Sequence, residues 1–155
     1  MFHELLSVPF LALLVAAAAI DFKLRIVPNR LVAPAALWAV AATAVLAPAE
    51  VAGRMLAGAL AFAAMLIPAL VRPGALGMGD VKLAGTMGLY LGASVIPALM
   101  AAFLAGSVAG AAVLVRQGRS ARHAALPFAP FLGLGGIVGL AWGPELIALY
   151  LGRLR

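Results

Sequence analysis

The chain has 155 residues, of which 66% are apolar and only 10% are charged. A soluble domain contains about 25% charged residues, so this composition excludes a water-soluble globular protein. The sequence has no cysteine, which excludes disulfides, thiol catalysis and cysteine-ligated zinc. The two histidines, His3 and His123, are too few and too isolated for a metal site.

Apolar stretches separated by charged residues, prolines and glycines predict an all-α, polytopic membrane protein with six transmembrane helices. In chain order the stretches cover about Leu5–Ile20, Leu31–Leu46, Met55–Val71, Val81–Leu91, Ser94–Val115 and Phe128–Leu151. Little sequence remains between them, so we expect one membrane-embedded domain, residues 1–155. No Lys or Arg precedes the first stretch, which argues against a cleaved signal peptide.

The fourth stretch is unusually short. A helix from Val81 to Leu91 is about 16 Å long at 1.5 Å per residue, which is roughly half the thickness of the hydrocarbon core. We therefore expect the preceding segment, Gly77–Gly79, to dip into the membrane. Asp80 would then open a short helix beside a water-filled cavity, because irregular backbone at membrane depth needs such shielding.

The distribution of Lys and Arg predicts the orientation of the chain. The residues after the first, third and fifth stretches are Lys23, Arg25, Arg30, Arg72, Lys82, Arg116, Arg119 and Arg122; those on the other side are Arg54, Arg153 and Arg155. The larger set is expected in the cytoplasm by the positive-inside rule, with both termini outside. Asp21 ends the first helix and Asp80 begins the fourth, so both should lie at the cytoplasmic face.

Two of the five acidic residues are functional candidates. The three glutamates fall in or beside short loops at the outer face, and we interpret them as solvated interfacial residues. Asp21 and Asp80 instead flank apolar helices, and an ionisable residue at membrane depth is a candidate for function. Structural roles are the alternative, since Asp80 could be a helix N-cap and Asp21 could pair with Arg25 one turn later.

Three short motifs accompany the two aspartates. The first is a basic stretch and a Pro-Asn pair after the first aspartate, Asp21-Phe22-Lys23-Leu24-Arg25-Ile26-Val27-Pro28-Asn29. The second is a Gly-x-Gly-Asp motif followed by x-Lys-Leu, Gly77-Met78-Gly79-Asp80-Val81-Lys82-Leu83. The third is Pro127-Phe128-Ala129-Pro130-Phe131.

This set of motifs resembles the prepilin peptidase family, also called type IV leader peptidases. Bacterial members carry a Pro-Phe-Gly-Pro-Phe signature, in which this sequence has Ala129 in place of the usual glycine. Many members also have an N-terminal cytoplasmic domain with paired cysteines that methylates the new N-terminus. The present chain begins at the first helix and resembles the minimal form without the methyltransferase domain, found with Flp/Tad-type pili or in archaeal preflagellin peptidases. The third motif favours the bacterial group.

The resemblance implies an aspartic endopeptidase that needs no cofactor or metal. It would remove the short basic leader of prepilin or pseudopilin substrates at the cytoplasmic face of the bacterial inner membrane, with Asp21 and Asp80 as its catalytic pair. The other motif residues that it implies for the site are Gly77, Gly79, Lys82, Lys23, Arg25, Pro28, Asn29, Pro127, Phe128 and Pro130. No nucleic-acid partner is expected, and the sequence leaves the oligomeric state open.

Two aspartates can hydrolyse a peptide bond when they hold one water molecule between them. One ionised carboxylate takes a proton from the water and the other, protonated, donates to the carbonyl, because like charges a few Å apart cannot both ionise. Gly77 and Gly79 could adopt unusual φ/ψ and let the backbone approach a substrate. We expect the carboxyl groups to face one another across a wet cavity, without a direct hydrogen bond, with Lys23, Arg25 and Lys82 at its rim.

Two other functions are compatible with the pattern. A small proton-coupled transporter could use Asp21 and Asp80 as proton sites, since broken helices beside acidic residues occur in transporters. The absence of an internal repeat and the position of both acids at one face argue against it. A structural membrane subunit would leave the glycines around Asp80 without a purpose.

Overall fold

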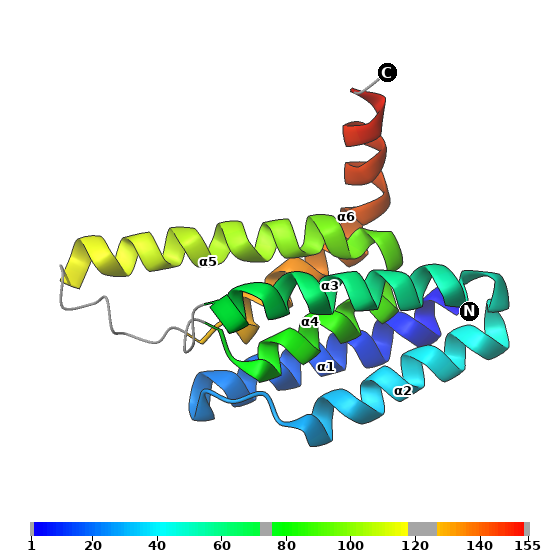
Figure 1. Ribbon diagram of the computed structural model, residues 1–155, viewed down its shortest axis with the longest axis horizontal. Coiled ribbons are helices and arrows are strands. Elements are labelled where there is room, and N and C mark those ends of the chain that lie inside the picture. The colour runs from blue at the N-terminus through cyan, green and yellow to red at the C-terminus, as the bar shows by residue number, and fades with distance from the viewer. Residues whose placement is uncertain (1, 72–75, 118–126, 154–155) are drawn as a thin grey trace.

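The computed structural model describes residues 2–71, 76–117 and 127–153 (Figure 1). Regular structure in these ranges is helical: α1 (Phe2–Leu24), α2 (Asn29–Leu46), η1 (Pro48–Glu50), α3 (Val51–Val71), α4 (Met78–Leu91), η2 (Gly92–Ser94), α5 (Val95–Gln117) and α6 (Ala129–Gly152). Each predicted apolar stretch corresponds to one α-helix, with ends that agree to within a few residues. The prediction of an all-α protein is confirmed.

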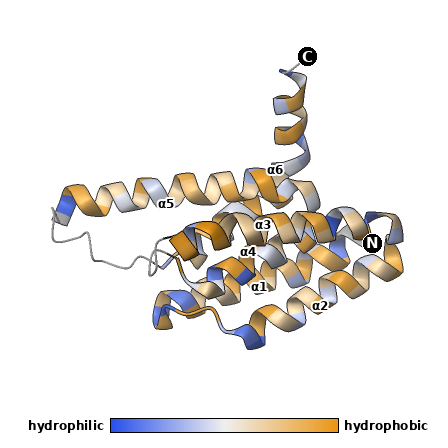
Figure 2. Ribbon diagram, viewed as in Figure 1, coloured by the Kyte–Doolittle hydropathy of each residue, from blue (hydrophilic) through white to orange (hydrophobic). Residues whose placement is uncertain are grey.

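Five helical stretches are long and apolar enough to cross a membrane: Glu4–Leu24, Asn29–Leu46, Pro48–Val71, Met78–Arg116 and Ala129–Gly152. The predicted number was six. The difference arises because α4, with 14 residues, is short and continues through η2 into α5. Figure 2 shows apolar residues along the helices, with hydrophilic residues toward the helix ends. The chain is a multi-pass membrane protein.

The chain reverses direction between α4 and α5. Gly92 has φ 57° and ψ −135°, a conformation with positive φ that glycine adopts readily because it has no Cβ. Beyond this turn α5 runs back along the bundle (Figure 1).

Helix α4 forms the buried centre of the bundle. It packs against α1, α2, α3, α5 and α6, and nine of its 14 residues are buried. The hydroxyl of Tyr90 donates a hydrogen bond to the carbonyl oxygen of Ala35 at 2.9 Å. The ring of Tyr90 stacks on that of Phe10, with 5.0 Å between the centroids. These contacts fix α4, which carries Asp80, relative to α1 and α2.

Small residues bring helix backbones into direct contact. A Cβ added to Gly88 of α4 would lie 2.6 Å from the Cα of Gly58 in α3. A Cβ added to Gly139 of α6 would lie 2.7 Å from the Cβ of Ala98 in α5. Close approach at small residues is a common way to associate helices in membranes, where lipid weakens the hydrophobic drive.

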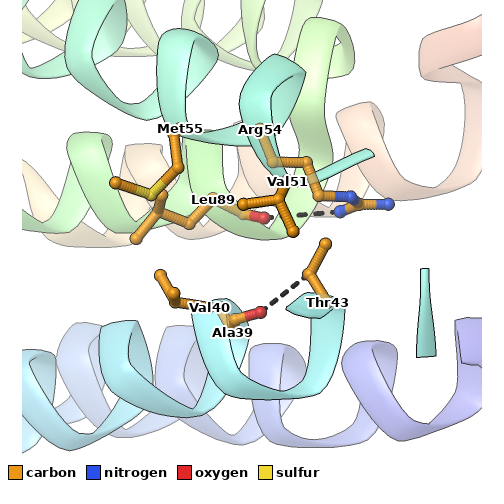
Figure 3. Close-up of a pocket in the computed structure, with 7 residues that line it drawn as sticks. All are labelled: Ala39, Val40, Thr43, Val51, Arg54, Met55 and Leu89. Atoms are coloured by element: carbon orange, nitrogen blue, oxygen red, sulfur yellow. Dashed lines mark hydrogen bonds between the residues drawn. The ribbon is translucent and has the colours of Figure 1, made fainter. Parts of the chain in front are cut away.

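The far end of α4 is tied to α3 by Arg54. Its Nη1 donates to the carbonyl oxygen of Leu89, at 3.4 Å, and to that of Tyr90. Figure 3 marks the bond to Leu89 with a dashed line. The last carbonyls of a helix lack intrahelical partners, and a cationic side chain satisfies them. Arg54 also forms a salt bridge with Glu50 at 2.8 Å. Glu50, which the sequence predicted to be a solvated interfacial residue, is exposed and has an ion-pair partner.

The C-terminal part of α6 turns away from the other helices (Figure 1). Pro144 lies inside this helix. Proline removes one backbone hydrogen bond and its ring clashes with the preceding turn, so it is a common cause of a sharp bend. The residues beyond Pro144 are mostly exposed.

Candidate active site

Asp21 lies in the last turn of α1 and is buried, with 4% of its surface exposed. Its Oδ2 accepts a hydrogen bond from the backbone N–H of Ala129 at 3.0 Å. Ala129 is the first residue of α6, where N–H groups have no partner within the helix. Arg25, the alternative partner suggested by the sequence, is exposed and donates its backbone N–H to the carbonyl oxygen of Asp21 at 2.8 Å.

This hydrogen bond joins the third motif to the first aspartate. It uses the backbone of Ala129 and therefore does not depend on the side chain at that position. Pro130 lies in the first turn of α6. Backbone N–H groups in this turn have no partner within the helix, so a proline is tolerated there. Phe128 packs against the ring of Phe103 in α5, with 5.6 Å between the centroids. Pro127, also part of the motif, precedes α6 and is half-buried.

Asp80 lies in the first turn of α4 with 7% of its surface exposed. Its Oδ1 is buried and has no hydrogen-bond partner in the described part of the chain. The N-cap of α4 is Gly77, which provides no side-chain cap, so the interpretation of Asp80 as the N-cap residue is wrong. A buried polar atom without a partner destabilises a fold, and such atoms in native proteins are often functional.

The two aspartates come together where α1 packs against α4. Their carboxyl groups are close enough to interact electrostatically. Gly77 is also near this point, since a Cβ added to it would lie 3.2 Å from Oδ2 of Asp80. The structure thus gathers residues of α1, α4 and the start of α6 around two buried carboxyl groups.

Gly79 contacts the linker between α1 and α2. A Cβ added to Gly79 would lie 2.8 Å from both the Cβ and the carbonyl oxygen of Val27, far inside the normal packing distance. The glycine is therefore needed for close approach of two backbones. The expectation of an unusual φ at Gly79 is wrong, because Gly92 is the glycine with positive φ among the described residues.

The motif residues after each aspartate also meet. Nζ of Lys82 donates a hydrogen bond to Oδ1 of Asn29 at 2.9 Å. Pro28 is the N-cap of α2, and its carbonyl oxygen accepts the N–H of Leu31 at 3.0 Å. Lys82 therefore contacts the start of α2, while Lys23, at the end of α1, is exposed.

Comparison with known proteins identifies the family. Residues 8–115 match the type IV leader peptidase family. The chain belongs to this family. This range contains Asp21 and Asp80 with their flanking motifs, whereas the third motif lies beyond it and is joined to the site by the hydrogen bond of Ala129.

Three relatives are described as prepilin leader peptidase/N-methyltransferase. The chain is 32% identical to that of Bacillus subtilis (strain 168) over 146 residues, which are 94% of the chain and 58% of the relative. It is 36% identical to that of Legionella pneumophila over 78 residues (50% and 27%) and 35% identical to that of Xanthomonas campestris pv. campestris over 77 residues (49% and 26%). The chain therefore spans less than two thirds of the length of these relatives. No solved structure is significantly similar to it.

This member of the leader peptidase family has a groove of about 500 Å³ between α2, α3 and α4. Asn29 and Lys82 line it together with mostly apolar residues, and neither aspartate does. The groove is thus separate from the wet cavity that we expected between the first and fourth helices. In the described part of the chain both aspartates are almost completely buried.

Several residues used in the sequence analysis fall outside the described ranges. They are Arg72, Arg119, Arg122, His123 and Arg155. Two contact residues of the site, Val27 and Ala129, were not predicted from the sequence. The only hint of their importance was their position inside motifs, because a buried valine and a backbone N–H carry no chemical signature.

Proposed function

We propose that the chain is a membrane aspartic endopeptidase that removes the short basic leader of prepilins or pilin-like precursors. One observation carries this proposal: Asp21 and Asp80, from two helices that pack against each other, are both almost completely buried. Membership of the leader peptidase family supports the reaction class. The names of the relatives support prepilins as the substrates.

In the proposed reaction the two carboxyl groups hold one water molecule. The ionised carboxylate takes a proton from the water as the water oxygen bonds to the carbonyl carbon of the scissile peptide, and the protonated carboxyl donates to the carbonyl oxygen. The tetrahedral intermediate then collapses. The carbon–nitrogen bond breaks, the first carboxyl protonates the leaving amine, and the second takes a proton back from a hydroxyl of the intermediate. The pair ends with one proton, as it began.

The hydrogen bonds of the site suit such a water. One oxygen of Asp21 is occupied by the N–H of Ala129, which fixes the orientation of the carboxyl group and leaves its other oxygen for the water. Oδ1 of Asp80 has no partner among the described residues. A buried acceptor of this kind is explained if water or substrate satisfies it during the reaction.

We further propose six membrane passes, with both termini outside and the two aspartates at the cytoplasmic face of the bacterial inner membrane. Helices α4 and α5 would make separate passes because the chain turns at Gly92. Lys23 and Arg116 lie in the last turns of α1 and α5, and Lys82 lies near the start of α4. Basic residues at this end favour a cytoplasmic location.

The proposed substrates are pilins of the Flp/Tad type. This narrower assignment rests on the resemblance of the motifs to those of the small bacterial members of the family. Archaeal preflagellins are the second choice, because the third motif is typical of bacterial members.

Co-expression with a candidate prepilin tests the proposal. We expect the leader to be removed by the unchanged chain and by Glu145→Gln, a matched change of an exposed carboxylate, but not by Asp21→Asn or Asp80→Asn. Gel mobility and the mass of the product report cleavage, and the mass also reports methylation, an activity that the names of the relatives include. Near-normal turnover by either Asn variant would show that the catalytic assignment is wrong. If no variant cleaves any prepilin, proton flux into vesicles becomes the test of the transporter alternative.

A further inference from the structure

The linker between α1 and α2, together with the first residue of α2, is held against the first turns of α4 at two points. At the first point the backbone of Val27 touches Gly79, where a Cβ would lie 2.8 Å from the carbonyl oxygen of Val27. At the second point Lys82 donates a hydrogen bond to Asn29 at 2.9 Å. Val27 is itself buried in the core. We call these two contacts the linker clamp.

The linker clamp lies next to both aspartates in the sequence. Gly79 immediately precedes Asp80, and the linker begins four residues after Asp21, at the end of α1. A shift of the linker away from α4 would therefore change the separation of the two carboxyl groups. Val27 is buried but its neighbour Ile26 is 56% exposed, so packing holds the linker at one residue and the hydrogen bond of Lys82 to Asn29 adds a second point.

We infer that Lys82 and Asn29 are positioning residues, whose hydrogen bond keeps the linker on α4 and thereby sets the separation of Asp21 and Asp80. The kinetic part of this inference rests on the proposed function. Misplaced catalytic groups lower turnover while substrate binding is retained. Loss of the hydrogen bond is therefore expected to lower kcat with little change in KM.

Paired substitutions measure the effect on turnover. We expect Lys82→Met and Asn29→Leu each to lower kcat by about tenfold or more, with KM within about twofold, and the double variant to be no slower than the slower single one, since both remove one interaction. Asn29→Asp keeps an oxygen acceptor and should retain most of the activity. Arg30→Met is the matched control, because it removes a positive charge from an exposed neighbour of Asn29.

A structural measurement tests the inference independently of activity. The chain has no cysteine, so spin labels can be attached to cysteines introduced at Ile26 and Met78, which are 56% and 49% exposed. We expect the dipolar interaction between the labels to weaken in Lys82→Met and Asn29→Leu, and to stay unchanged in Arg30→Met. Asn29 is exposed, so its substitution is not expected to unfold the protein.

The two measurements separate failure of the inference from failure of the proposed function. An unchanged dipolar interaction in Lys82→Met, or a rise in KM at constant kcat, would overturn the positioning role; the latter result would make Lys82 a substrate-binding residue. Rate losses that multiply in the double variant would also overturn it. If the unchanged chain cleaves no prepilin but the labels respond as expected, the proposed function fails and the linker clamp stands.

Discussion

Asp21 and Ala129 are joined by a hydrogen bond of 3.0 Å between Oδ2 and the backbone N–H, although 108 positions separate them in the sequence. The candidate catalytic residue is therefore also the group that satisfies the first N–H of α6. Asp80 differs, because its Oδ1 is buried without a partner among the described residues. Substitution of the two members of the pair should therefore affect stability to different extents.

Asp21→Ala should destabilise the protein more than Asp21→Asn. Asparagine keeps an oxygen that accepts the N–H of Ala129, whereas alanine leaves this buried donor unpaired, at a cost of about 1–3 kcal/mol. Thermal unfolding in detergent measures the difference, with both variants inactive in the cleavage assay. Equal melting temperatures for the two variants would mean that the hydrogen bond to α6 contributes nothing to the fold.

Asp80→Ala should be inactive but should lose less stability than Asp21→Ala. The substitution removes Oδ1, a buried oxygen that has no partner in the described residues, and deletion of such a group relieves its desolvation penalty. This gain offsets the loss of the hydrogen bond between the carboxyl group and the backbone of Gly77. Groups that are kept at the expense of stability are typical of functional sites. Thermal unfolding in detergent measures the stability of this variant as well. A marked loss of stability would show that Asp80 has a structural role instead.

The helices and the two aspartates were predictable from the sequence because their signals are local. A run of apolar residues defines a membrane helix, and a carboxylate such as Asp80 stands out within one. The contact of Asp21 with Ala129 was not predictable, because it depends on how α6 packs against α1. The pairing of Lys82 with Asn29 likewise depends on the relative placement of α2 and α4.

Gly79 shows a different limit of sequence reasoning. The absence of a Cβ can permit either an unusual φ or the close approach of another backbone, and the sequence does not distinguish the two. The contact with Val27 identifies close approach as the reason. The short α4 was anticipated from its length, but its continuation into α5 through Gly92 was not, since a single glycine is compatible with several turns.

Gly79→Ala should reduce both stability and cleavage. The added Cβ would lie 2.8 Å from the Cβ and carbonyl oxygen of Val27, and these atoms cannot rotate away, so overpacking of about 1–3 kcal/mol is expected. Gly53→Ala is the matched control in α3. It has no atom within 4 Å of an added Cβ and should gain up to about 1 kcal/mol from helix propensity. Similar melting temperatures for the two variants would remove the close-approach argument.

Glu50→Gln should be nearly silent, whereas Arg54→Gln should destabilise the bundle. The salt bridge between the two residues involves a Glu50 side chain that is 51% exposed, and exposed pairs contribute about 0–1 kcal/mol. Arg54 also donates to the carbonyl oxygens of Leu89 and Tyr90 at the end of α4. Loss of hydrogen bonds from a charged donor costs about 1.5–3 kcal/mol. Equal unfolding temperatures for the two variants would show that Arg54 does not stabilise the end of α4.

The proposed orientation predicts which positions are accessible from each side of the membrane. A cysteine introduced at position 52, at the start of α3, should react with a membrane-impermeant maleimide added to intact spheroplasts, and one at position 118, beyond the end of α5, should not. After the membrane is opened, both should react. The unchanged chain has no cysteine and provides the unlabelled control.

This labelling pattern follows from the charge distribution. Eight of the 11 Lys and Arg residues were assigned to the side that carries Asp21 and Asp80, and such an excess marks the cytoplasmic side. Labelling of position 118 but not of position 52 in intact spheroplasts would invert the orientation and place both aspartates outside. Cleavage of a leader on the cytoplasmic side would then be impossible, because the leader could not reach the buried pair from that face.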